Sequence, residues 1–144
     1  MRGRTLATAE SCTGGMIGAA VTAVPGSSAV YKGGIISYTN AVKHKLLQVE
    51  QSLLDQFGAV SAPVAQAMAR GARCALEADA AVSVTGLAGP GGDEFGNAVG
   101  TVFIGYCDER CNISREFHFS GGRDQVRTQA AEAALRLILE MAKR

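Results

Sequence analysis

The sequence predicts an α/β domain in which a mixed β-sheet lies between layers of helices. Three observations support this fold class. Apolar residues alternate along the chain between the spacing of amphipathic helices and that of short strands. The segment 80–85 is almost purely apolar, as in a strand that is covered on both faces. The chain has 144 residues, which corresponds to one domain with a core large enough to fold without disulfides or a structural metal.

Strands and helices alternate in the predicted order of elements. The predicted strands are 5–9, 29–38, 80–85, 99–107 and 113–119. The predicted helices are 13–24, 40–49, 52–57, 61–77 and a last one from the glycines after Ser120 to about 143. Pro25-Gly26 ends the first helix, and Gly33-Gly34 favours a bulge in the second strand. Asn40 and Ser61 are expected as N-caps, and the last two strands as a hairpin.

The composition excludes several classes of protein. Hydrophobic residues make up 47% and charged residues 19% of the chain, so it is not intrinsically disordered. A formal net charge of +1 argues against a nucleic acid or an anionic membrane as partner. The chain has no run of about 18 apolar residues and no recognisable signal peptide, so we expect a cytoplasmic protein with reduced thiols.

A metal site is not expected from the sequence. Of the 4 cysteines, only Cys107 and Cys111 are close in sequence, and they lack a second pair or a histidine at ligand spacing. Asp93 and Glu94 could suggest magnesium, but two neighbouring carboxylates in a loop are usually just solvated.

The first segment that could carry chemistry runs from Ala9 to Gly15, between a predicted strand and a predicted helix. Ser11 lies at this junction, where its hydroxyl would be near the free backbone N–H groups of the helix N-terminus. A serine in this place can attack a carbonyl while the N–H groups of residues 12–14 hold the oxyanion. The alternative is that Ser11 or Thr13 is only an N-cap.

The second segment, 37–44, also runs from a strand end into a helix. Lys43 lies in the first turn of that helix, where the helix dipole disfavours a positive charge and lowers the pKa of the amine. Such a lysine can act as a general base, although an ordinary solvated lysine is the alternative. His44 and His118 are the histidines of the chain, and either could pair with Ser11. No third residue is marked to orient the imidazole, so we favour the lysine.

The third segment, 82–92, leaves the most apolar strand at Thr85 and continues with several glycines. Glycines allow backbone N–H groups to approach a phosphate or an amide closely, although a flexible connection between strands is the alternative. The chain has no Walker A motif, no G-x-G-x-x-G after a strand and no G-x-S-x-G motif.

Two arginines open the last predicted helix. Arg123 and Arg127 are four residues apart and therefore share a helix face, where they could clamp an anion. The alternative is that they cover the solvent face and pair with Asp124 or Glu132.

Taken together, these segments resemble the CinA C-terminal family, whose enzymes, called PncC, are nicotinamide-nucleotide amidohydrolases. The resemblance covers the chain from about residue 5 to its end and is carried by Thr8 to Gly15, Pro25 to Ser28, Tyr38 to Lys43, Gly58 to Ser61, Thr85 to Pro90, Val99 to Val102, and Phe119 to Gly121 with Arg123 and Arg127. Seven segments in the same order are far more specific than any single motif.

The resemblance implies a three-layer α/β/α fold with a mixed, mostly parallel sheet of about five strands. It implies hydrolysis of nicotinamide mononucleotide (NMN) to nicotinate mononucleotide and ammonia, without metal or cofactor, in pyridine nucleotide recycling. The implied catalytic residues are the nucleophile Ser11, the base Lys43, and the supporting residues Tyr38 and Thr85. The residues expected to bind the substrate are Cys12, Thr13, Gly14, Gly15, Gly86, Gly89, Arg123 and Arg127. We also expect a homo-oligomer, such as a dimer.

The sequence departs from the family pattern in two places. Family members usually have a helix before the first strand, where only residues 1–4 are found here. The glycine loop usually continues with Lys-Pro, but here it contains Asn97-Ala98, which puts loop closure and turnover in question. The 144 residues match this domain alone, without the larger nucleotide-hydrolysing domain of many relatives. A non-catalytic nucleotide-binding or competence-associated module on the same fold is the alternative function.

Overall fold

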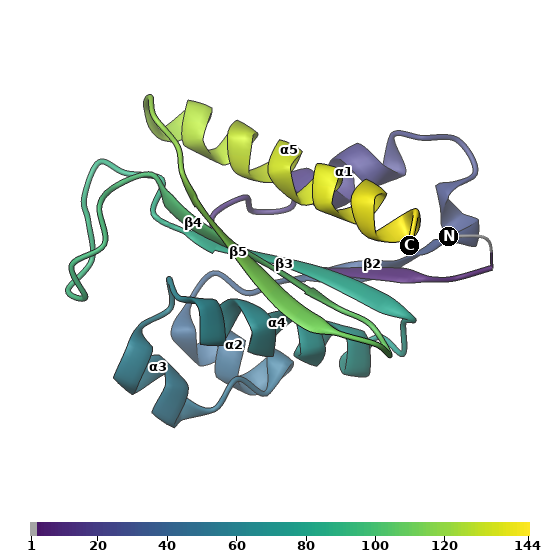
Figure 1. Ribbon diagram of the computed structural model, residues 1–144, viewed down its shortest axis with the longest axis horizontal. Coiled ribbons are helices and arrows are strands. Elements are labelled where there is room, and N and C mark those ends of the chain that lie inside the picture. The colour runs from purple at the N-terminus through teal and green to yellow at the C-terminus, as the bar shows by residue number, and fades with distance from the viewer. Residues whose placement is uncertain (1–2) are drawn as a thin grey trace.

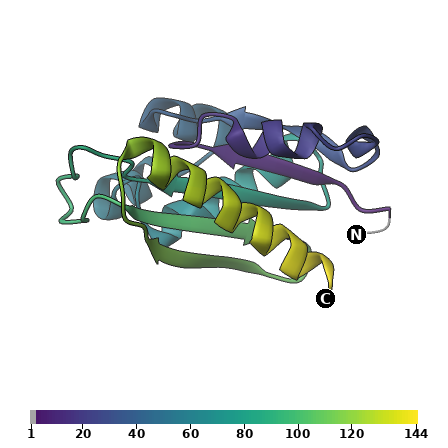
Figure 2. The same ribbon diagram turned by 90° about the horizontal axis from the view of Figure 1, so that it is seen from above.

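A five-stranded β-sheet runs through the centre of the chain, with helices on both faces (Figures 1 and 2). The computed structural model describes residues 3–144. The strands are β1 (Leu6–Glu10), β2 (Tyr31–Ile36), β3 (Ala80–Gly86), β4 (Thr101–Cys107) and β5 (Asn112–His118), in the order β2-β1-β3-β4-β5. β1 pairs in parallel with β2 and β3, whereas β4 is antiparallel to both β3 and β5. β4 alone therefore opposes the common strand direction, which confirms the mixed, mostly parallel sheet.

The helices form two layers, which confirms the three-layer α/β/α fold. α1 (Met16–Thr22) and α5 (Arg123–Ala142) contact each other and cover one face of the sheet. The other face is covered by α2 (Asn40–Leu47), α3 (Gln51–Phe57) and α4 (Ala62–Ala75). A short 3₁₀ helix, η1 (Ser27–Ala29), precedes β2. Within residues 3–144, no helix has the length and apolar character needed to cross a lipid bilayer.

β3 contributes to two hydrophobic cores at once. Val82 and Val84 pack into the core on the side of α1 and α5, while Ala81 packs into the core beneath α2, α3 and α4. Ser83 also points into the second layer, where its hydroxyl donates a hydrogen bond to the carbonyl of Ala65 at 2.6 Å. Because successive side chains of a strand point to opposite faces, a strand between two helical layers is mostly apolar on both faces.

The bulge in β2 was predicted correctly from the sequence, whereas the side-chain capping of α2 and α4 was not. The β1–β2 register shifts between Leu6 and Ala7, so Lys32 is an extra residue directly before Gly33, which has φ 141°. The N-cap of α2 is Thr39 instead of Asn40, because the hydroxyl of Thr39 accepts the N–H of Val42 and Asn40 is already helical. The Ser61 hydroxyl donates to the carbonyl of Gly58 and does not cap α4.

Candidate active site

Ser11 lies directly after β1, at the edge of the sheet where the parallel strands β1, β2 and β3 end. Its N–H donates to the carbonyl of Val84 at 3.0 Å, and its own carbonyl accepts the N–H of Gly14 at 3.2 Å. Gly14 and Gly15 follow with φ 60° and φ 112°, values that favour glycine. The turn therefore holds Ser11 at the carboxyl ends of the strands, which is where open α/β sheets bind their ligands.

Glu10 holds this turn from the other face of the sheet. The buried carboxylate accepts the Thr13 hydroxyl at 2.6 Å and the backbone N–H groups of Ile17 and Gly18 at 2.9 and 3.0 Å. The first turn of α1 is thus satisfied by a carboxylate of the protein, and Gly15 occupies its N-cap position. The expectation that free N–H groups of this helix end face the Ser11 hydroxyl is wrong, and so is an N-cap role for Ser11 or Thr13.

Lys43 reaches Ser11 from the first turn of α2. Its side chain is buried, at 1% exposure, and Nζ lies 3.0 Å from the Ser11 hydroxyl oxygen and 3.3 Å from the carbonyl oxygen of Tyr38. Burial lowers the pKa of Lys43 from its usual 10.5 to about 8, and the Cys12 thiol nearby opposes this only in part. A fraction of the lysine is therefore neutral near pH 7, so the pair has the geometry and the basicity for proton transfer.

Other candidate nucleophiles and bases are disfavoured by the structure. Burial raises the pKa of the Cys12 thiol to about 11, so this thiol stays protonated near neutral pH. The ring of His44 bonds to the carbonyl of Val49 at 2.8 Å, and that of His118 to Glu116 at 2.6 Å. Neither histidine is among the residues around Ser11, so a serine–histidine or cysteine–histidine pair is not formed.

A cavity of about 290 Å³ opens beside Ser11. The expected site residues in its wall are Ser11, Cys12, Tyr38, Lys43, Thr85, Gly86, Gly89 and Arg123. Asn40 and Val60 also contribute to the wall, although they were not predicted as site residues from the sequence. Thr13, Gly14, Gly15 and Arg127 lie outside this wall and shape the turn behind it.

The supporting residues act in ways that the sequence did not predict. Tyr38 contacts Lys43 through its backbone carbonyl, while its ring is 59% exposed and its hydroxyl accepts a hydrogen bond from Arg123 at 3.2 Å. The hydroxyl of Thr85 donates to the carbonyl of Ala59 at 2.8 Å. Thr85 thereby ties the end of β3 to the loop before α4, which also lines the cavity.

The two arginines of α5 point to different groups. Arg123 donates to the carbonyl of Gly89 at 2.6 Å and lines the cavity, with no carboxylate within 4.0 Å over the described residues. Arg127 instead donates to the carbonyls of Cys12 and Thr13 at 2.9 and 3.4 Å. The shared helix face was predicted correctly, but Arg127 holds the Ser11 turn, so of these two arginines Arg123 is the one placed to meet an anion in the cavity.

Asn97 closes the glycine loop in place of the expected Lys-Pro. Its side-chain amide donates to the Asp93 carboxylate at 2.7 Å and to the carbonyl of Val60 at 3.1 Å. The same carboxylate accepts the backbone N–H groups of Phe95 and Asn97, each at 3.0 Å. Asp93 therefore organises its own loop, and Asn97 fastens that loop to the cavity wall at Val60.

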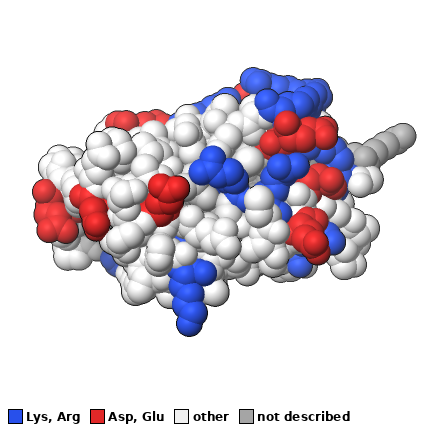
Figure 3. All heavy atoms as spheres, turned by 90° about the horizontal axis from the view of Figure 1, so that it is seen from below, with Lys and Arg blue, Asp and Glu red and all other residues white. Residues whose placement is uncertain are grey.

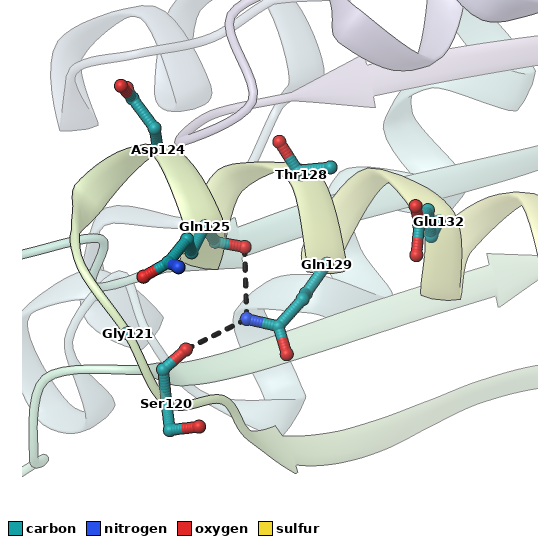
Figure 4. Close-up of a pocket in the computed structure, with 7 residues that line it drawn as sticks. All are labelled: Ser120, Gly121, Asp124, Gln125, Thr128, Gln129 and Glu132. Atoms are coloured by element: carbon teal, nitrogen blue, oxygen red, sulfur yellow. Dashed lines mark hydrogen bonds between the residues drawn. The ribbon is translucent and has the colours of Figure 1, made fainter.

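A larger hollow of about 480 Å³ lies along the first turns of α5 (Figure 4). Its wall includes Ser120, Gln125, Gln129 and Glu132, and Gln129 donates to the carbonyls of Ser120 and Gln125. No lysine or histidine lines it, so Ser120 has no base comparable to Lys43. On the side of α2, α3 and α4, acidic side chains lie at one end of the face, and acidic and basic side chains lie together at the other end (Figure 3).

The fold and the site together define a class: a three-layer α/β/α domain with a buried serine–lysine pair at the ends of its parallel strands. Residues 1–142 match the CinA C-terminal domain, and the chain belongs to this family. A competence-damaged protein (CinA) superfamily structure from Escherichia coli is 36% identical, with a TM-score of 0.95 over 97% of this chain and 81% of that chain. The competence/damage inducible protein CihA from Agrobacterium tumefaciens is 38% identical, with a TM-score of 0.94 over 98% and 87%.

Sequence relatives carry this domain within longer chains. A CinA-like protein of Geobacter metallireducens is 51% identical over 133 residues, which is 92% of this chain and 32% of the relative. A CinA-like protein of a Synechococcus species is 49% identical over 135 residues, again 32% of its length. The chain thus spans about a third of the length of these relatives.

Proposed function

We propose that this domain is an amidohydrolase that converts the carboxamide of NMN to the acid and releases ammonia. The observation that carries the proposal is the distance of 3.0 Å between Lys43 Nζ and the Ser11 hydroxyl oxygen, both buried at the wall of a cavity. The family includes amidohydrolases, which supports this class of reaction. The choice of NMN follows from the resemblance to the PncC enzymes.

In the first half of the reaction, the neutral amine of Lys43 accepts the proton of the Ser11 hydroxyl as its oxygen attacks the carboxamide carbon. The carbonyl oxygen becomes an oxyanion. We assign its stabilisation to the backbone N–H groups of Cys12 and Thr13, which over residues 3–144 donate to no backbone carbonyl. The N–H of Gly14 was expected to contribute, but it donates to the carbonyl of Ser11.

In the second half, the ammonium of Lys43 returns its proton to the leaving nitrogen, and the C–N bond breaks to release ammonia. This leaves an ester between the Ser11 oxygen and the acyl group of the substrate. A water then attacks the ester carbon while Lys43 accepts one of its protons. Breakage of the ester bond returns this proton to Ser11 and releases nicotinate mononucleotide.

Arg123 supports a nucleotide as the substrate. Its guanidinium is free of carboxylate partners over the described residues, and Arg123 lines the same cavity as Ser11. A guanidinium of this kind binds a phosphate through two parallel hydrogen bonds. The cavity of about 290 Å³ is at the lower end of the usual size of small-molecule sites, which suits the pyridine ring with the phosphate directed to Arg123.

The test is an ammonia assay with NMN, nicotinamide and NAD side by side. We expect release from NMN and at least a hundredfold loss of kcat in both Lys43→Ala and Lys43→Arg, because arginine keeps the charge but cannot act as a base near neutral pH. A Lys43→Arg enzyme within tenfold of wild type would remove Lys43 from this role. A melting temperature raised by NMN without ammonia release would instead indicate the non-catalytic binding module.

A further inference from the structure

Ser37, the residue between β2 and Tyr38, has a buried hydroxyl without a partner. Its side chain is 0% exposed, and its oxygen makes no hydrogen bond over residues 3–144. Buried hydroxyls are nearly always bonded, because removing one from water without a partner costs free energy. Ser83, which is equally buried, does have a partner, the carbonyl of Ala65 at 2.6 Å. The hydroxyl of Ser37 therefore has no evident role in holding the fold.

The backbone places Ser37 on the same face of the sheet as Ser11 and Lys43. The N–H of Ser37 donates to the carbonyl of Glu10 at 2.8 Å, which extends the β1–β2 pairing by one residue and makes Ser37 the neighbour of Ser11 on the next strand. Ile35 packs beneath α2, α3 and α4. Since side chains alternate along a strand, Ser37 faces the same helical layer, from which Lys43 approaches.

The hydrogen bonds of Lys43 leave room for one more acceptor. Its nitrogen contacts the Ser11 hydroxyl and the Tyr38 carbonyl, and over residues 3–144 it has no third partner. A charged ammonium has three N–H donors, and each gains more from an acceptor than an N–H of a neutral amine does. The demand for a third acceptor is therefore greatest after Lys43 has taken up a proton.

We propose that Ser37 is a positioning residue whose hydroxyl oxygen turns toward Lys43 and accepts its third N–H while Lys43 carries the proton of Ser11. No covalent bond changes at Ser37. The inference rests on the proposed role of Lys43 as the base. It explains why a hydroxyl without a partner is kept in a buried place: the hydroxyl gains its partner when it turns toward the charged form of Lys43.

An acceptor of this kind favours the ammonium, so its removal lowers the pKa of Lys43 further. Other ionisable groups also face this lysine. They are the Cys12 thiol beside Ser11, and Tyr38 and Arg123, which also line the cavity, while Glu10 points to the opposite face of the sheet. All of them remain in a Ser37→Ala variant, so a change in the titration of Lys43 would report the loss of the Ser37 hydroxyl.

The experiment compares wild type with Ser37→Ala. In the variant we expect kcat with NMN to fall at least fivefold with KM within twofold. The ascending limb of the pH profile should move to lower pH by about half a unit or more. The pKa of Lys43, followed by NMR of ¹³C-labelled lysine without substrate, should move in the same direction. The melting temperature should stay equal or rise, because the variant removes a polar group that had no partner.

Ser83→Ala is the matched control, since it makes the same change at an equally buried serine outside the cavity wall. We expect it to lower the melting temperature, because the buried hydrogen bond from Ser83 to the Ala65 carbonyl is lost, and to leave kcat unchanged. The proposal is wrong if Ser37→Ala keeps kcat within twofold and the pKa of Lys43 in place. It is also wrong if Ser37→Ala destabilises the protein as Ser83→Ala does. If wild type releases no ammonia, the proposed function fails, while the NMR titration still decides whether Ser37 acts on Lys43.

Discussion

Replacing Lys43 by methionine should make the protein more stable and inactive at the same time. Methionine has a similar length and no charge, so it can fill the space of the buried side chain without the cost of an ammonium removed from water. The exposed fraction of Lys43 is only 1%, so its charge is poorly solvated by water. The lysine is therefore expected to reduce the stability of the fold in exchange for its position beside Ser11.

The size of this effect follows from the titration of Lys43. Burial lowers its pKa from 10.5 to about 8, which corresponds to about 3 kcal/mol because one pKa unit equals about 1.4 kcal/mol. Methionine does not donate to the carbonyl of Tyr38, and this lost hydrogen bond costs about 1 kcal/mol. We therefore expect Lys43→Met to raise the free energy of unfolding at pH 7 by about 2 kcal/mol, or the melting temperature by roughly 6–8 °C.

The gain should depend on pH in a defined direction. Between pH 8 and 10.5 the unfolded wild type binds the proton that the folded form has lost, so the stability of the wild type rises with pH in this window. Below pH 8 both forms carry the proton and the full cost remains. The difference between Lys43→Met and wild type should thus be constant from pH 6 to 7.5 and shrink toward pH 10.5.

Urea unfolding of both proteins at several pH values measures this difference. Lys45→Met is the control, because Lys45 is exposed on the same helix and should show no such pH dependence. The assignment of a buried lysine with a lowered pKa would be refuted by a Lys43→Met protein that is less stable than wild type at pH 7. It would also be refuted if the difference in free energy of unfolding did not change up to pH 10.5.

Three further outcomes are expected. Ser11→Ala should abolish ammonia release while circular dichroism shows an intact fold. Cys12→Ala should keep most activity, because burial raises the pKa of that thiol to about 11. The reverse pattern would indicate a thiol nucleophile. Glu10→Ala should lower the free energy of unfolding by about 2–4 kcal/mol in urea, since three donors lose their acceptor; a loss under 1 kcal/mol would show that the turn is held otherwise. Arg123→Ala should raise KM for NMN at least tenfold with a smaller change in kcat, and unchanged KM would exclude a phosphate contact.

The fold could be predicted from the sequence where the signal was local. The apolar segment 80–85 became the buried strand β3, and the paired glycines at 33–34 gave the bulge of β2. The N-cap of α2 was missed because Thr39 and Asn40 are both good caps, and only the backbone of Thr39, at φ −102° and ψ 159°, leaves its hydroxyl free to accept an N–H.

Parts of the site depend on contacts that no local pattern contains. The pairing of Ser11 with Lys43 was expected from the resemblance, but the burial that lowers the pKa of Lys43 comes from the packing of the layer around α2. The bond from Arg127 to the carbonyl of Cys12 spans 115 residues of sequence. The role of Glu10 left one trace in the sequence: a carboxylate at the end of an apolar strand, followed by small residues, which is unusual unless its charge is bonded.

The position of Glu10 has a consequence for anyone who wishes to change what this domain acts upon. The carboxylate stabilises the Ser11 turn from the α1 side, whereas the cavity lies on the opposite side of β1. This support is therefore separate from Asn40 and Val60, which line the cavity on the side of α2 and α4. Residues such as Asn40 and Val60 can be varied in a library of variants for new amide substrates, while the hydrogen bonds of Glu10 continue to hold the turn that carries the nucleophile. This separation makes the cavity wall a suitable place to begin such engineering.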